Sequence, residues 1–446
     1  MKKLLLISCC MMVFAGSCSS VKEKETHPQW ARNAVVYEVN VRQITPEGTF
    51  EAFRKMLPGL RDLGVDVLWF MPIHPIGEEG RKGTLGSYYA IRDYGAVNPE
   101  FGTLEDFRLV VDKAHELGMK VMLDWVAAHT SRDAVWLEHE DWYVRRPDGE
   151  PEFLYDWSDV ARLNYDSRPM REAMLDKMRF WVEEVDVDGF RCDMADLTPI
   201  DFWEHAVPDL RRVKEDLFML AESEDPVNTK EAFNAYYGWR LHHTLNDVAR
   251  GEKNADSIRH CLGQMLAEFG PNAIPLLFTS NHDENSWNGT EFERMGAAAK
   301  QMAALTFVLP GMPLIYTGQE LGNVKRLEFF EKDRVKPGDS LLFTSFYTQL
   351  THFKHSSPAL QAPPYGGPLN EILHDGPAHV FAFTREAAGN RVLALFNFAD
   401  SSVSFRFTGN EVKGKYTDWK NKDTLWVNQD TVWELKPYGY RLYTIE

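Results

Sequence analysis

One short stretch of the sequence limits the fold more than any other, and it reads Gly189-Phe190-Arg191-Cys192-Asp193. It has the length of a buried β-strand that ends on a carboxylate. Because side chains alternate along a strand, Arg191 and Asp193 are predicted to share one face, with Phe190 and Cys192 on the other. A guanidinium next to a carboxylate favours the charged form of that carboxylate. Taken alone, the stretch indicates no more than a structural Arg–Asp pair.

Two more acidic residues follow apolar runs of strand length. Glu222 closes the run at 217–221, and Asp283 follows the run at 274–278. Glu222 comes 29 residues after Asp193, and Asp283 comes 61 residues after Glu222, which corresponds to one and two strand–helix units of ~30 residues. The carboxyl ends of parallel strands meet at one rim of a barrel. We therefore expect the three carboxylates on strands four, five and seven of an eightfold barrel.

The rest of the chain supports this architecture. Strand-like and helical patterns alternate in the first third of the chain, which is typical of parallel α/β folds. A helical pattern at 50–63 ends at Gly64, a common helix stop. The alternation breaks at 130–165, and beyond residue 365 the hydrophobic period changes to two. We predict an α/β protein: a (β/α)8 TIM barrel at 31–365 with a short insertion at 130–165 after strand 3, and a C-terminal antiparallel β-sandwich domain at 366–446.

The acidic residues lie in motifs that resemble the signature regions of the α-amylase superfamily, glycoside hydrolase family 13. The resemblance runs from about residue 34 to the C-terminus and rests on five segments: 89–94, 124–129, 189–193, 221–222 and 278–283. It implies that Asp193 is the nucleophile, Glu222 the general acid/base and Asp283 the stabiliser of the transition state. It also implies a set of residues that bind the sugar ring being cleaved: Tyr89, His129, Arg191, Asn281 and His282.

The same resemblance implies an activity. A member of this family would be a retaining glycoside hydrolase that cleaves α-glucosidic bonds, chiefly α-1,4, in starch-like glucans or maltooligosaccharides by double displacement. An exo-acting α-glucosidase or an α-glucosyl transferase of the same superfamily is the alternative. A non-catalytic, amylase-like binding protein is a third option, although such proteins typically lack one or more of the three acids. The insertion is rich in aromatic residues, one of which we expect to be a sugar platform: Trp136, Trp142, Tyr143 or Trp157.

Two positions depart from the family's calcium site. Ala128 stands where the family has an asparagine ligand, and Arg162 stands where it has an acidic ligand. Alanine offers no side-chain oxygen, and the arginine brings its own positive charge. We therefore expect no metal and no cofactor at this site, although calcium elsewhere stays open.

The N-terminus resembles a bacterial lipoprotein signal. A basic start precedes an apolar run at 4–14 and small residues before Cys18. This pattern predicts a signal peptide at 1–17, lipidation of Cys18, a polar tether at 18–30, and export to the outer membrane or periplasm; plain secretion is the alternative. The net charge of −17 argues against nucleic-acid or anionic-membrane partners and is compatible with a neutral glucan. We expect a monomer.

Overall fold

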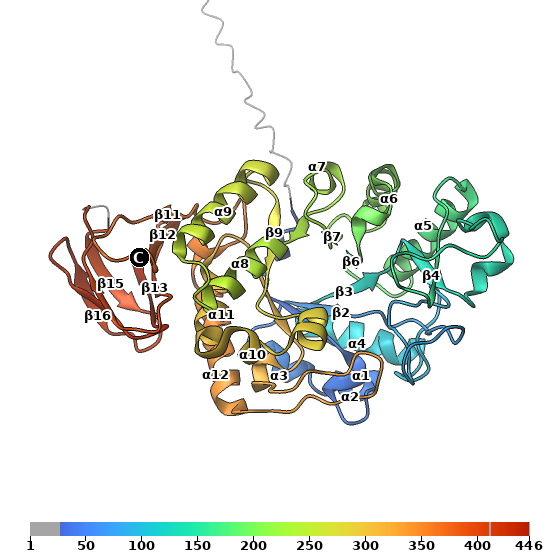
Figure 1. Ribbon diagram of the computed structural model, residues 1–446, viewed down its shortest axis with the longest axis horizontal. Helices are drawn as coiled ribbons and strands as arrows, with labels where there is room; N and C mark the ends of the chain where they lie inside the picture. Colours follow the sequence, from blue (N-terminus) through green and yellow to red (C-terminus); the bar gives the residue numbers. More distant parts are fainter. Residues whose placement is uncertain (1–26, 410–411, 446) are drawn as a thin grey trace, which may run out of the picture.

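The computed structural model describes residues 27–409 and 412–445 and contains a closed parallel barrel (Figure 1). Its strands pair in the order β1-β10-β9-β8-β7-β6-β3-β2. Their bounds are β1 Val36–Val39, β2 Val67–Phe70, β3 Lys120–Trp125, β6 Gly189–Cys192, β7 Phe218–Ala221, β8 Ala235–Tyr237, β9 Ile274–Leu277 and β10 Met312–Tyr316. The predicted barrel is confirmed, and β6, β7 and β9 are its fourth, fifth and seventh strands.

Helices cover the outside of the barrel (Figure 1). They are α1 Val41–Ile44, α2 Phe50–Arg54, α3 Leu57–Leu63, α4 Leu104–Glu116, α5 Arg168–Glu183, α6 Ile200–Val213, α7 Asn228–Glu231, α8 Trp239–Ala249, α9 Ala255–Phe269, α10 Glu291–Met295, α11 Ala299–Val308 and α12 Ser340–His355. The pattern at 50–63 forms two helices, α2 and α3, rather than one. Pro58 lies in the first turn of α3, where a missing N–H is tolerated, and interrupts the predicted continuous helix. Gly64 ends α3 in the left-handed conformation with φ 96°, as expected of a helix-stopping glycine.

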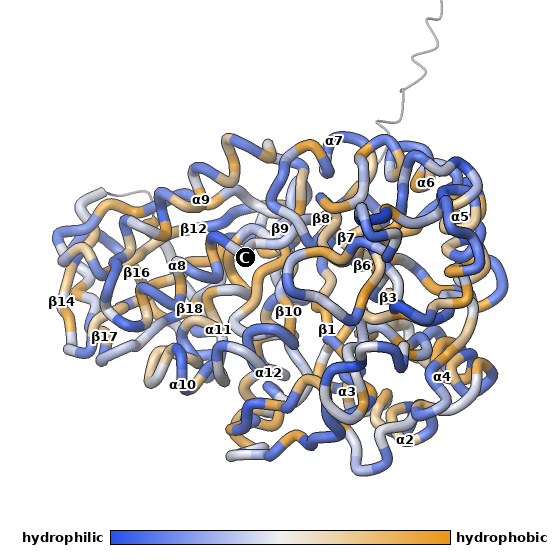
Figure 2. The backbone as a smooth tube through the Cα atoms, turned by 45° about the vertical axis from the view of Figure 1, so that its right-hand side comes forward, coloured by the Kyte–Doolittle hydropathy of each residue, from blue (hydrophilic) through white to orange (hydrophobic). Residues whose placement is uncertain are grey.

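The strands separate an inner core from an outer one. Apolar side chains inside the barrel include Val36, Val67 and Phe218, whereas Phe190 and Cys192 of β6 pack outward in the cluster that the helices share. Figure 2 shows hydrophobic residues along the central strands and alternating hydropathy along surface helices such as α9. The side-chain alternation predicted for residues 190–193 is therefore present.

The insertion after β3 is a small antiparallel unit. β4 (His129–Ser131) pairs with β5 (Val160–Arg162). Of its aromatic residues, Trp136 and Tyr143 are buried in the main core. Trp142 is partly buried and stacks on His139, with ring centroids 4.0 Å apart. Of the four aromatic residues, Trp157 alone lines the pocket described below, so it is the candidate platform.

The C-terminal domain is built from antiparallel strands and lies beside the barrel at the left of Figure 1. A six-stranded sheet has the order β11-β12-β13-β18-β15-β16, and β14 pairs with β17. The bounds are β11 Asn370–Glu371, β12 Val380–Ala387, β13 Asn390–Asn397, β14 Val403–Phe405, β15 Gly414–Asp418, β16 Thr424–Val427, β17 Trp433–Leu435 and β18 Tyr440–Ile445. Buried Arg385 of β12 joins the domains, because its Nη1 donates to the carbonyl oxygens of Val308 and Leu309 at the end of α11.

The N-terminal predictions fall largely on residues 1–26, which lie outside the described residues, as do Cys18 and the signal peptide. The tether is predicted at 18–30, but the folded part of the chain already includes residues 27–30. His27 is buried, Asn234 Nδ2 donates to its Nδ1, and a 3-10 helix spans Gln29–Asn33. In the described part of the chain, no helix combines the length and apolar character needed to cross a membrane.

Candidate active site

A fully buried arginine organises the carboxyl rim of the barrel. Arg191 projects inward from β6, and its Nη1 lies 2.9 Å from an oxygen of Asp193 and 2.9 Å from an oxygen of Asp124. Its Nη2 lies 2.9 Å from Glu222 Oε2. The predicted Arg191–Asp193 pair is present. Arg191 has no exposed surface and does not line the pocket; its side chain binds the acidic residues, and its contact with a sugar stays a prediction.

The three predicted acids line one pocket. Asp193 follows β6, Glu222 follows β7 and Asp283 lies beyond β9, so the parallel strands bring them to the same rim. The pocket has a volume of about 480 Å³. Glu222 Oε2 also accepts a hydrogen bond from the backbone N–H of Met194 at 2.9 Å. The oxygen that points toward the Arg191 guanidinium is therefore fixed from two sides.

Burial dominates the electrostatics of two of these acids. Burial raises the pKa of Glu222 to about 7, although Arg191 opposes the shift. It also raises the pKa of Asp193 to about 6, again against Arg191. The sequence predicted that Arg191 keeps Asp193 ionised, but the desolvation of the carboxylate outweighs the guanidinium. Burial raises the pKa of Glu222 well into the range of a group that can hold a proton, which suits a general acid.

The third acid is paired with the histidine that precedes it. Burial would raise the pKa of Asp283, but His282 lowers it below its usual value. His282 Nε2 lies 3.1 Å from Asp283 Oδ2 and 2.8 Å from the Tyr89 hydroxyl. The Tyr89 and His282 rings stack with centroids 5.3 Å apart. Tyr89, His282 and Asp283 thus form one wall of the pocket, and the histidine keeps Asp283 anionic.

The remaining two predicted residues differ in their placement. His129 lines the pocket, and burial lowers its pKa to about 4, so the ring is neutral. Its Nε2–H donates to the Tyr89 carbonyl at 3.2 Å. Asn281, in contrast, is fully buried and is not a pocket residue; its Oδ1 accepts from the Glu284 N–H at 2.7 Å. The side chain therefore closes the turn beneath Asp283, and its contact with a sugar stays a prediction.

Sequence reasoning missed several residues of the site. Asp124 and Glu38 each lie one residue before the end of a strand, β3 and β1, so the strand-end signal that found the three pocket acids could have found both. The aromatic rim carries no such signal. Trp287 lies in a π-helix at Glu284–Asn288 and packs on Phe329 and Phe330, with Trp157 also lining the pocket. Single-turn π-helices often occur at functional sites.

The position at which the sequence predicts a lost calcium site has poor ligands. The buried Ala128 uses its carbonyl oxygen to accept from the Leu163 N–H at 3.1 Å. Arg162 points to a partly exposed ion pair, with Nη1 2.7 Å from Glu152 Oε2. A side chain without oxygens and a paired guanidinium do not form a cage for a hard cation. The residues therefore do not fit a calcium ion there.

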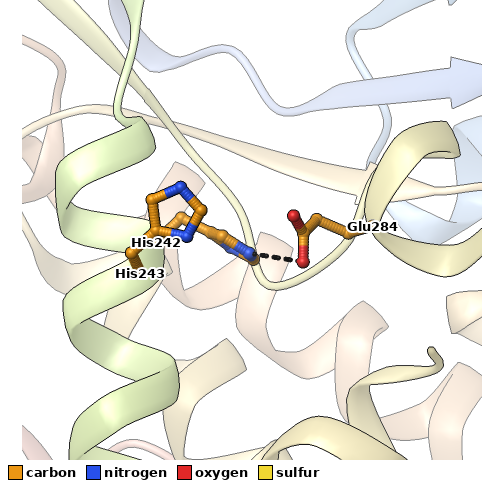
Figure 3. A group of neighbouring side chains, drawn as sticks. All are labelled: His242, His243 and Glu284. Atoms are coloured by element: carbon orange, nitrogen blue, oxygen red, sulfur yellow. Dashed lines mark ion pairs between the residues drawn. The ribbon is translucent and has the colours of Figure 1, made fainter. Parts of the chain in front are cut away.

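A second group of metal-binding side chains lies on α8 and the π-helix. Figure 3 shows His242 reaching toward Glu284 while His243 points away from it, although ligand atoms of all three lie within 4.8 Å. His242 Nε2 pairs with Glu284 Oε2 at 3.1 Å, and Arg294 Nη1 lies 3.6 Å from the same oxygen. The cationic Arg294 already balances this carboxylate. The group therefore anchors the π-helix that carries Trp287.

A (β/α)8 barrel with three acids at its carboxyl rim, two of them on one arginine, is an arrangement typical of retaining glycoside hydrolases. The alpha amylase catalytic domain family model matches residues 23–339. The chain belongs to this family.

Named relatives agree with this assignment. Alpha-amylase MalA of Haloarcula japonica is 30% identical over 409 residues, which cover 88% of this chain and 59% of the relative, so the chain spans about three fifths of that protein. The solved structure of the noncanonic maltogenic alpha-amylase AmyB from Thermotoga neapolitana has a TM-score of 0.85 and 29% identity, and the match covers 93% of this chain and 98% of that one. An alpha-amylase from Lactobacillus plantarum has a TM-score of 0.82 and 31% identity over 95% of this chain and 100% of its own.

Proposed function

We propose that the protein is a retaining glycoside hydrolase that cleaves α-glucosidic bonds, chiefly α-1,4, in starch-like glucans or maltooligosaccharides. The observation that carries the proposal is the shared guanidinium of Arg191, which lies 2.9 Å from both Asp193 and Glu222. A retaining pair needs its carboxyl groups close together, at roughly 5–5.5 Å, and an inverting pair needs a wider gap for water. Two acids on adjacent strands that share one arginine suit the closer spacing.

In the proposed mechanism, the Asp193 carboxylate attacks the anomeric carbon while Glu222 gives its proton to the departing glycosidic oxygen. The product of this step is a glycosyl ester on Asp193. Glu222, now a carboxylate, removes a proton from water, which attacks the same carbon and releases Asp193. Asp283 remains anionic beside His282 and offers negative charge where the sugar ring becomes positive.

The stereochemistry of the first products tests this mechanism. Two displacements at one carbon restore its configuration, so an α-linked maltooligosaccharide is expected to release α-anomeric sugars first. Proton NMR during the first minutes, before mutarotation, makes the measurement. Release of β-anomers would remove the nucleophile role from Asp193. Chromatography of products from starch, maltooligosaccharides, trehalose and sucrose in the same reactions separates endo-acting hydrolysis from exo-acting α-glucosidase and transferase action.

Calcium is expected to be dispensable at the position of Ala128 and Arg162. The reason is the poor ligand set there, with one carbonyl already hydrogen-bonded and one guanidinium paired to Glu152. We expect the melting temperature to change by less than about 2 °C when chelator is added. Removal of an ion present at about 100 times its Kd would lower the free energy of unfolding by about 2.7 kcal/mol and the melting temperature by several degrees. A large, calcium-reversible drop would contradict the proposal if crystallography placed the ion at Ala128 and Arg162, and would indicate a different calcium site if the ion lay elsewhere.

We further infer that the enzyme is an exported, monomeric lipoprotein anchored through Cys18. The contacts of His27 support a particular orientation: it packs against Asn234 and Asn272, which precede β8 and β9, on the rim opposite the acids. A stretch of residues 19–26 reaches at most roughly 28 Å. The barrel floor would thus face the membrane and the pocket would face away from it. Cys18→Ala is expected to move the protein from the membrane fraction to the soluble fraction and to abolish labelling by palmitate; unchanged partitioning would exclude the anchor.

A further inference from the structure

Glu38 in β1 is a buried acid to which the proposed mechanism gives no task. It has no exposed surface, and its Oε1 accepts a hydrogen bond from His282 Nδ1 at 2.5 Å. Its other oxygen, Oε2, is buried and has no hydrogen-bond partner among the described residues. A buried carboxylate is costly unless it is paired, so the contact with His282 is its main compensation.

The hydrogen bonds around His282 define its protonation. The Tyr89 hydroxyl donates its one hydrogen to Asp124 Oδ2 at 3.0 Å, so it can only accept from His282 Nε2, 2.8 Å away. Nε2 also faces the Asp283 carboxylate at 3.1 Å. Nδ1 faces the Glu38 carboxylate. Because both ring nitrogens face acceptors, both carry a proton and the ring is an imidazolium.

The wider surroundings agree with a charged ring. Titratable and charged groups from seven barrel strands surround His282 and its two acids: Glu38 from β1, Tyr89 after β2, Asp124 from β3, Arg191 and Asp193 at β6, Glu222 after β7, Tyr237 from β8 and Tyr316 from β10. Arg191 is the one cation in this set apart from His282, and it already contacts Asp124, Asp193 and Glu222. Although burial opposes charge, Asp283 and Glu38 together raise the pKa of His282 well above its usual value.

We propose that Glu38 is a positioning residue for the proposed glycosidase reaction: it holds His282 as a doubly protonated ring, which in turn fixes the charge and orientation of Asp283. The effect is transmitted through a single side chain, His282, from buried Glu38 in β1 to the wall of the pocket. The proposal rests on the proposed function for its catalytic consequence, but the state of His282 can be measured without any substrate.

The Glu38→Gln variant separates charge from shape. The amide oxygen can still accept from His282 Nδ1, but the negative charge is gone, so Nε2 is expected to lose its proton near neutral pH. Asp283 then faces a bare nitrogen and its pKa rises. The pKa of Asp283, followed by carbon-13 NMR of its labelled carboxyl group, is expected to move up by about one pH unit. Near pH 6, kcat is expected to fall about tenfold or more, with a smaller change in KM.

A matched control is Glu320→Gln. Glu320 is also a buried acid next to β1, but it accepts from the Tyr37 hydroxyl at 2.9 Å and does not contact His282. Its removal is expected to leave the pKa of Asp283 in place. Glu38→Asp retains the charge and is expected to restore the wild-type pKa of Asp283 at least in part. An unmoved Asp283 pKa in folded Glu38→Gln, or an equal shift in both glutamine variants, would overturn the proposal.

Nitrogen-15 NMR of histidine-labelled protein provides the direct measurement, with His282 assigned by the signal missing from His282→Gln. Two protonated ring nitrogens are expected in the wild type from pH 5 to beyond pH 8, and only one near pH 7 in Glu38→Gln. A neutral His282 in the wild type at pH 6 would overturn the proposal, even if Glu38→Gln failed to fold. If the wild type cleaved no glucan but His282 were charged through Glu38, the proposed function would fail and the pairing would stand.

Discussion

Replacing Asp193 with asparagine is expected to reduce kcat/KM for maltooligosaccharides by about 10⁴-fold or more, because an amide cannot form the glycosyl ester. The fold should be retained, since asparagine keeps the volume of the side chain and its oxygen can still accept from Arg191. Reducing-sugar release measures the loss, and the melting temperature checks the fold. A glucan-binding measurement on the same variant distinguishes an enzyme from a binding protein, because binding should persist while hydrolysis disappears.

Two further variants test whether Asp193 is the nucleophile. Asp196→Asn alters an acid three residues away that accepts from Ser223 and Asn228 and does not line the pocket, so it should keep most of the activity. Asp193→Gly opens a space for azide at the face from which Asp193 attacks. With an α-glycosyl fluoride, azide should then yield the β-glycosyl azide. Wild-type rates in Asp193→Asn, or an α-azide from the glycine variant, would place the nucleophile elsewhere.

Replacing Glu222 with glutamine is expected to slow glucan hydrolysis by 10²- to 10⁴-fold, roughly the contribution of a positioned general acid. The first step on a glycosyl fluoride should be slowed far less, because fluoride leaves without a proton. The pKa of Glu222 lies at about 7, and the general acid must be protonated. Wild-type activity should therefore fall as the pH rises through about 7, and this alkaline limb should disappear in the variant.

Glu224→Gln is the matched control for this second substitution. Glu224 lies two residues further along and pairs with Arg240 rather than with the acids of the pocket. The Glu224→Gln variant should keep the fall in activity at alkaline pH. It should also keep the wild-type ratio of rates on glucan and glycosyl fluoride. Equal losses on glucan and glycosyl fluoride in Glu222→Gln would mean that Glu222 does not protonate the leaving group.

The sequence by itself determined which acids reach the pocket. Each follows an apolar run of strand length, and parallel strands in a barrel must end at one rim, so Asp193, Glu222 and Asp283 could be placed from local pattern and spacing alone. The same alternation placed Arg191 inward and Cys192 outward. These are short-range properties, because the direction of a side chain on a strand depends on its neighbours in the chain.

Contacts across the barrel were decided only by the tertiary structure. Glu38 and His282 lie 244 residues apart in the sequence and become a buried pair when β1, β10 and β9 come together in the closed barrel. Local pattern placed Asn281 two residues before Asp283, but the turn buries its side chain. The pKa of Asp193 also depended on how deeply the side chain is buried. The sequence contains Arg191, which lowers this pKa, but it does not show how much water folding removes from the carboxylate. That desolvation is the larger effect, so the pKa rises.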